Sequence, residues 1–128
     1  MFRITALSLE YFISDCWDIA RNSLVKRFQH WGDVFSVDFA IGVTKLPSVN
    51  WTNVFHFTAD GNDGKYGNRI PTLFVNNDPT AFPHTDGFFQ IGSAVNGEYN
   101  YNINYGFVLG KLYYFAIKQY EDMGKYFF

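Results

Sequence analysis

The chain has 128 residues and a formal net charge of −2, from 10 Lys and Arg against 12 Asp and Glu. This length is typical of one domain, and the near-neutral balance argues against a nucleic-acid partner, which would favour a basic face. Aromatic residues make up 21% of the chain, so disorder is excluded, and a single Cys excludes both a disulfide framework and a thiolate zinc site.

The first 21 residues differ from the rest because they contain neither Gly nor Pro. Their apolar spacing fits a strand or a helix, and Ser14 with Asp15 could cap a short helix. We therefore predict an N-terminal segment of unassigned role over residues 1–21 and one domain over residues 22–128. No run reaches the roughly 18 apolar residues of a membrane span, so no transmembrane segment is expected.

Beyond residue 22 the apolar residues recur with period two, which predicts short strands with one buried face. The expected strands are 35–41, 51–57, 70–75, 88–95, 99–105, 111–119 and 125–128. In the second of these, alternation places Trp51, Asn53, Phe55 and Phe57 on one face and Val54 and His56 on the other. Turn signals separate the strands, and Asn96-Gly97 is a strong hairpin signal. The pattern predicts an all-β fold, an antiparallel sandwich or barrel, and the aromatic content favours two sheets packed face to face.

The chain closes on the apolar strand Tyr126-Phe127-Phe128. Since an apolar strand seldom ends at a true terminus, we expect a truncated domain or fragment. Its exposed sheet edge would then need a partner, so self-association is expected as well.

The loop after the second strand carries three candidate metal ligands, Asp60, Asn62 and Asp63, in a Gly-rich setting. Calcium prefers such oxygen ligands. The spacing excludes an EF-hand, because Gly64 occupies position five and no Glu follows at position twelve. An irregular calcium loop and a plain turn both remain open. Arg69 is expected to fix this loop by pairing with Asp60 or Asp63.

The strand at 99–105 alternates aromatic and amide residues and is the candidate ligand-binding surface. Amides donate and accept hydrogen bonds, and aromatic faces can stack on sugar rings. The candidate glycan-binding residues are Tyr99, Asn100, Tyr101, Asn102 and Asn104. An ordinary solvent face, and a strand prone to pairing with another chain, are the alternatives.

No catalytic constellation emerges from the remaining residues. The three Glu residues, Glu10, Glu98 and Glu121, are far apart in the sequence, whereas a glycosidase needs two facing carboxylates. No G-x-S-x-G motif occurs. The His residues are too widely spaced for a compact metal motif, and His56 is expected to be partly buried and hydrogen-bonded. We therefore expect a protein that is not an enzyme.

Five segments occur in an order that resembles one family of animal extracellular modules. They are WGDVFSVDF (31–39), WTNVFHFT (51–58), YGNRIPTLF (66–74), SAVN (93–96) and GKLYYFAIKQ (110–119). Together they resemble concanavalin A-like, laminin-G-like modules over residues 22–128. One departure is Leu112, where the family pattern has Trp after Gly-Lys.

The resemblance implies an antiparallel two-sheet sandwich of the jelly-roll, concanavalin A-like type, with Tyr66 and Arg69 in a structural loop. It also implies a noncatalytic binding module, extracellular or at the cell surface. Such a module recognises a glycan or an extracellular protein, often with calcium. The alternative is a structural or assembly subunit that is completed by strand pairing with a neighbouring chain.

Overall fold

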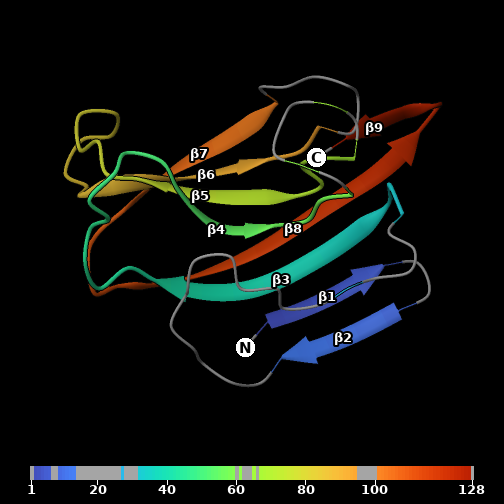
Figure 1. Cartoon of the computed structure of the whole chain (residues 1–128), viewed down its shortest axis with the longest axis horizontal. Coiled ribbons are helices and arrows are strands. Elements are labelled where there is room, and N and C mark those ends of the chain that lie inside the picture. The colour runs from blue at the N-terminus through green and yellow to red at the C-terminus, as the bar shows by residue number, and fades with distance from the viewer. Residues whose placement is uncertain are drawn as a thin grey trace. The chain divides into compact units, whose positions relative to one another are not determined.

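The computed structural model describes residues 2–6, 9–13, 27, 32–59, 61, 65, 67–94 and 101–127, with the backbone alone for 2–6 and 9–13. Within these residues all regular structure is β-strand (Figure 1). The strands are β1 (Phe2–Ala6), β2 (Leu9–Ile13), β3 (Phe35–Gly42), β4 (Thr52–His56), β5 (Thr72–Asn76), β6 (Gly87–Gly92), β7 (Asn102–Phe107), β8 (Leu112–Asp122) and β9 (Lys125–Phe127). The helix proposed to begin at Ser14 and Asp15 falls outside the described residues.

The strands form two sheets, in the orders β2-β1-β3-β8-β9 and β4-β5-β6-β7. The chain divides into two compact units that follow this partition, Met1–Ile41 with Tyr113–Phe128, and Gly42–Leu112. The prediction of an all-β fold with antiparallel strands in two sheets is confirmed. Among the described residues, none belongs to a helix with the length and apolar character that crossing a bilayer requires.

In the first unit, β3 has the alternation expected from its sequence. Phe35, Val37 and Phe39 are buried, while the residues between them are partly exposed. The Phe39 ring stacks on Phe115 of β8 with centroids 5.3 Å apart. β1 pairs with β3 from Phe2↔Phe39 to Ala6↔Phe35, so residues 2–6 belong to the sheet that β3 forms. The boundary at residue 21 stays a prediction.

In the second unit, β5 and β6 are the central strands and carry the core. Every residue of β5 is buried. Cross-strand pairing places Leu73 opposite Ile91 and Val75 opposite Phe89, so these side chains share one face of the sheet. The Phe89 ring packs on Phe107 of β7 at a centroid distance of 4.8 Å. β5 begins after Pro71, which has no backbone N–H to donate to a sheet.

The start of β6 depends on a glycine. A Cβ at Gly87 would overlap the carbonyl oxygen of Asn76 and lie 2.9 Å from Cζ of Phe107. Contacts this short force neighbouring backbone to move, so the space beside Gly87 admits no side chain.

We predict that Gly87→Ala lowers the free energy of unfolding by about 1–3 kcal/mol, the usual cost of overpacking a buried site. Urea unfolding followed by circular dichroism measures this change. The control is Gly32→Ala, because the nearest atom to a Cβ at Gly32 is 3.7 Å away. Equal stability losses in the two variants would contradict the packing seen at Gly87.

Candidate functional site

The β4–β7 sheet has two faces. On the face that does not carry Leu73 and Phe89, cross-strand partners form three rows of residues. Directly opposed residues of antiparallel strands share a face. The central row therefore runs Asn53, Phe74, Gln90, Asn104 across all four strands. Strands lie about 4.8 Å apart, so this row spans about 14 Å. We call its three amide residues, Asn53, Gln90 and Asn104, the amide row.

Trp51 lies beside the amide row and is 51% exposed. Its ring meets Phe74 edge-on, with centroids 6.4 Å apart, and Phe88 edge-on at 5.7 Å. Edge-to-face contacts of this kind hold an aromatic ring in a fixed orientation. Trp51 is thus anchored by its two ring contacts and still half exposed.

Phe74 and Phe88 lie beneath this surface and are 9% and 7% exposed. The guanidinium carbon of Arg69 lies 5.6 Å from the centre of the Phe74 ring, within cation–π range. Phe82 packs against Phe88 at a centroid distance of 5.7 Å. We refer to Trp51, Phe74, Phe88 and the amide row together as the aromatic–amide face.

A β-bulge in β4 determines which of its side chains join this face. The pairing with β5 shifts between Asn53 and Phe55, so Phe55 lies opposite Leu73 on the core face. His56 lies opposite Thr72 and therefore shares the face of Asn53. The strict alternation predicted for residues 51–57 is wrong here, because a bulge inserts one residue and reverses the order of faces beyond it.

His56 anchors the loop that joins β4 to β5. Its Nε2–H donates to the backbone carbonyl of Asn68, whose side chain is buried. The amide oxygen of Asn68 accepts from the N–H of Gly61 at 3.2 Å. Ala59 N–H donates to Gly67 at 2.8 Å and extends the hairpin. The prediction of a partly buried, hydrogen-bonded His56 is confirmed.

The predicted metal ligands Asp60, Asn62 and Asp63, and the loop residue Tyr66, lie outside the described residues. The pairing of Arg69 with an Asp of this loop therefore stays a prediction. The backbone carbonyl of Arg69 accepts a hydrogen bond from Ala94 at 2.7 Å. Among the side chains that are described, no three acidic, His or Cys residues come close enough to hold a metal ion.

Of the five candidate ligand-binding residues between positions 99 and 104, the structure describes three. Asn102 and Asn104 share the aromatic–amide face, since they oppose Gly92 and Gln90. Tyr101 precedes β7, and its carbonyl accepts from Ser93, while Tyr99 and Asn100 lie outside the described residues. Sequence reasoning missed Asn53 and Gln90 as candidate ligand contacts, because only the cross-strand register aligns them with Asn104. It also missed Trp51, whose place on this face follows from its ring contacts with Phe74 and Phe88.

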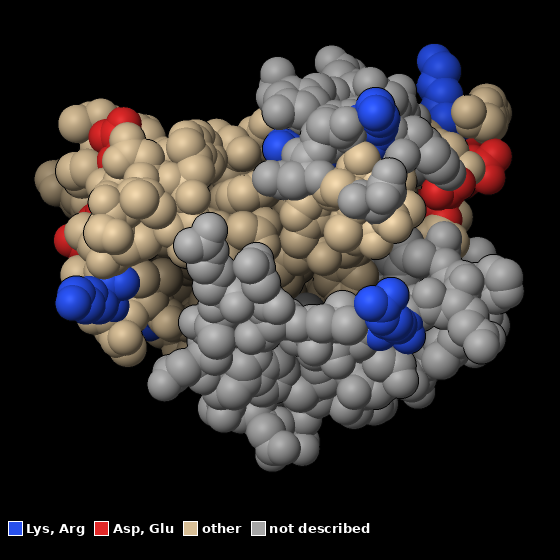
Figure 2. Space-filling view, viewed as in Figure 1, with Lys and Arg blue, Asp and Glu red and all other residues tan. Residues whose placement is uncertain are grey.

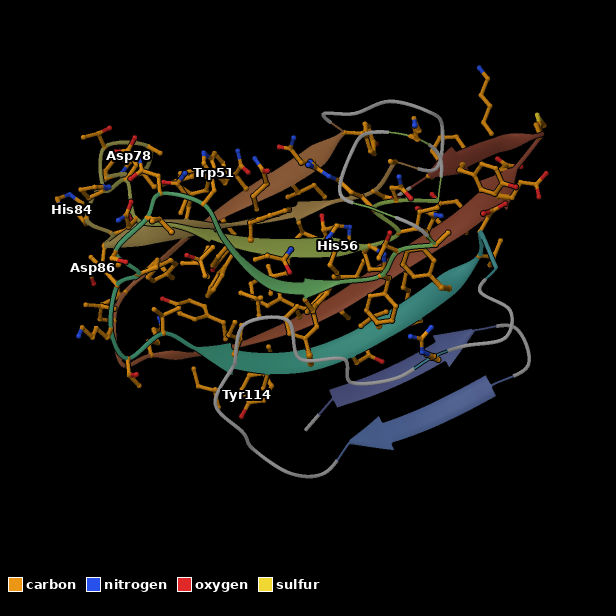
Figure 3. The ribbon with its side chains drawn as sticks, viewed as in Figure 1. Trp51, His56, Asp78, His84, Asp86 and Tyr114 are labelled. Atoms are coloured by element: carbon orange, nitrogen blue, oxygen red, sulfur yellow. The ribbon has the colours of Figure 1, made fainter. Side chains whose placement is uncertain are left out.

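Asp78, His84 and Asp86 lie near one end of the same sheet, away from His56 (Figure 3). The carboxylates of Asp78 and Asp86 accept hydrogen bonds from groups of nearby loops. Asp78 accepts from both the N–H and the hydroxyl of Thr80, and these hydrogen bonds lower the pKa of its carboxyl group. Asp86 accepts from the N–H of Leu109 at 2.8 Å. We therefore assign structural roles to Asp78 and Asp86.

The guanidinium of Arg69, which lies against Phe74, brings a positive charge to the aromatic–amide face. In the described part of the surface that Figure 2 displays, Lys and Arg are scattered rather than gathered into one patch. Comparison of the chain with protein-family models, curated proteins and solved structures found no match. The function must therefore be inferred from the residues of the face itself.

Burial lowers the pKa of His56 below its usual 6.5, and the positive charge of Arg69 lowers it further, although the hydrogen bond to Asn68 opposes both. The folded protein therefore binds a proton at His56 less readily than the unfolded chain does. Stability contributed by neutral His56 is present above pH 6.5 and is lost as the pH falls from 6.5 through the folded-state pKa.

We predict that the free energy of unfolding decreases between about pH 7 and pH 5, and that His56→Gln makes this dependence shallower. Gln keeps an N–H donor for the Asn68 carbonyl but binds no proton. Urea titrations at a series of pH values measure the slope. The control His84→Asn removes an exposed imidazole and suits the positive φ at that position. If His56→Gln and wild type have the same slope, the assignment of the pH dependence to His56 is wrong.

Proposed function

We propose that this chain is a noncatalytic recognition module that binds carbohydrate through the aromatic–amide face. The observation that carries the proposal is the position of half-exposed Trp51, anchored on Phe74 and Phe88, beside the amide row. An open indole ring offers an apolar surface to the C–H groups of a sugar ring. The neighbouring amides offer donors and acceptors to its hydroxyl groups.

The dimensions of the face favour an oligosaccharide over a single sugar. The amide row extends about 14 Å across the sheet, longer than one pyranose ring. Asn53 and Asn104 at its ends are exposed, and Gln90 in the middle is half-buried. The amide groups of the face suit the hydroxyl groups of a glycan, because amides both donate and accept hydrogen bonds.

The proposal includes the two-layer, concanavalin A-like and laminin-G-like sandwich suggested by the sequence segments, and a location outside the cell or at its surface. The two antiparallel sheets support the sandwich part of this proposal. A protein partner that presents the same hydroxyl-rich chemistry is the second class of ligand for this face.

Calcium is the proposed cofactor, held by Asp60, Asn62 and Asp63. Carboxylate and amide oxygens are the ligands that calcium prefers. The base of their loop fits such a role because it is fixed by the Ala59–Gly67 hydrogen bond and by buried Asn68, whose amide oxygen already accepts from Gly61. Bound calcium would supply positive charge that holds the loop in one conformation.

We predict that Trp51→Ala and Gln90→Ala each weaken binding of a soluble polysaccharide by at least about tenfold, since each removes a central contact. Affinity electrophoresis through gels containing xylan, mannan, β-glucan or heparin measures the retardation. Tyr114→Ala is the matched control, because Tyr114 is an aromatic residue of β8 that is 79% exposed. Heparin extends the test to an anionic glycan. Equal effects of Trp51→Ala and Tyr114→Ala, or no retardation of wild type by any gel, would reject the proposed site.

Repeating the gels with calcium chloride and with EDTA tests the metal separately. If calcium assists, EDTA and Asp63→Asn both reduce the retardation and lower the melting temperature by several degrees, because a ligand that binds only the folded state stabilises it. Unchanged retardation and melting would remove calcium from the proposal and leave the glycan site standing.

A further inference from the structure

Trp51 has a counterpart on the other side of the same sheet face, the loop residue Phe82. Phe82 packs on Phe88 at a centroid distance of 5.7 Å, the same distance at which Trp51 meets Phe88. Trp51 precedes β4 and also touches Phe74 of β5. Phe82 instead lies over Gly106 of β7, because a Cβ at that glycine would be 3.0 Å from Cβ of Phe82. Phe88 of β6 is therefore flanked by one ring on the β4 side and one on the β7 side.

The loop between β5 and β6 holds Phe82 on the sheet. The backbone carbonyl of Phe82 accepts a hydrogen bond from the Thr85 hydroxyl at 2.9 Å. Asp86 N–H donates to the carbonyl of Phe107 in β7 at 2.8 Å. The loop comes this close to β7 because Gly106 has no side chain, and a Cβ there would lie only 2.7 Å from the methyl carbon of Thr85. A ring that is already positioned costs less conformational entropy when a ligand binds it.

Each of the two flanking rings has an exposed amide residue beside it. Side chains two residues apart in a strand lie on the same face, about 7 Å apart. Trp51 is therefore beside Asn53, and Phe82, which lies over Gly106, is beside Asn104. Asn53 and Asn104 are exposed, and Phe82 is partly exposed. The amide row, about 14 Å long, thus has an aromatic ring with an amide at both of its ends.

We propose that Phe82 and Asn104 form a second sugar subsite, so that the face binds a linear oligosaccharide that reaches from Trp51 to Phe82. The inference rests on the proposed function and assigns a ligand contact to a loop residue. The ring offers an apolar surface to the C–H groups of a sugar, and the adjoining amide serves its hydroxyl groups. Because about 14 Å separate the ends of the amide row, one sugar does not occupy both subsites. Two linked sugars bind more tightly, since the second contact is made within the same complex.

The length of the glycan separates this subsite from the one at Trp51. Free disaccharides and hexasaccharides from xylan, mannan, β-glucan and heparin compete with the polymer in the gels. We expect the hexasaccharide of the polymer that retards wild type to compete at least about tenfold more effectively than its disaccharide. Phe82→Leu keeps an apolar side chain to pack on Phe88 but has no ring. It should lose most of this preference and bind the disaccharide as wild type does, whereas Trp51→Ala should bind both lengths more weakly.

Two further variants distinguish ligand contact from packing. Phe82→Tyr keeps the ring, so we expect it to keep the preference for the hexasaccharide. His84→Asn changes an exposed residue of the same loop and should behave as wild type. Thermal unfolding accompanies each binding measurement, and Phe82→Leu is expected to melt within several degrees of wild type. Should Phe82→Leu fail to fold, nuclear Overhauser effects between the Phe82 ring and the bound hexasaccharide in wild type decide, and their absence would reject the subsite.

The possible failures of the second subsite and of the proposed function differ. Wild type that binds both lengths equally, or Phe82→Leu with the full preference for the hexasaccharide, would overturn the second subsite and leave the Trp51 site standing. An equal loss for both lengths in Phe82→Leu would overturn it too, because such a loss indicates a packing role alone. Wild type that binds neither length would reject the proposed function, and the second subsite with it.

Discussion

The backbone register of β4, β5, β6 and β7 is the constraint on which the inferred site depends. Side chains alternate between faces along a strand, so a slip of one residue would exchange the core face and the solvent face. The observed register unites Leu73 and Phe89 in the core and lines up Gln90 with Asn104 on the other face. The bulge in β4 is part of the same arrangement, because it turns Phe55 to the core side while leaving His56 beside the loop that it anchors.

The aromatic–amide face combines packing with exposure. Phe74 and Phe88 are nearly buried, although they lie on the face that does not carry Leu73 and Phe89. This sheet therefore holds aromatic side chains on both faces. Trp51 covers part of the outer pair and remains half exposed. A residue in this position stabilises the sheet and presents a surface to a ligand at once. Variants of Trp51 therefore require a stability measurement beside every binding measurement.

The sequence alone predicts the strands of this fold. It does not predict which residues of different strands share a face. The alternation at 35–41 predicts β3 almost to the residue, because burial of one face is visible in the pattern. Strict alternation misses the bulge in β4, although Asn53 and Val54 break the apolar pattern that Trp51, Phe55 and Phe57 set. Gln90 lies between Phe89 and Ile91 in a strand that is otherwise buried, and this pattern indicates core rather than ligand contact. Only the three cross-strand pairings show that Gln90 shares a face with Asn53 and Asn104.

The most direct test of this account is a set of cross-strand nuclear Overhauser effects in isotopically labelled protein. The account predicts contacts of the Gln90 side chain with Phe74 and Asn104, and of the Trp51 indole with both the Phe74 and Phe88 rings. Contacts of the Gln90 side chain with Leu73 or Tyr105 instead would mean that the strands are shifted by one residue. The amide row would then be divided between two faces, and the proposed site would not exist.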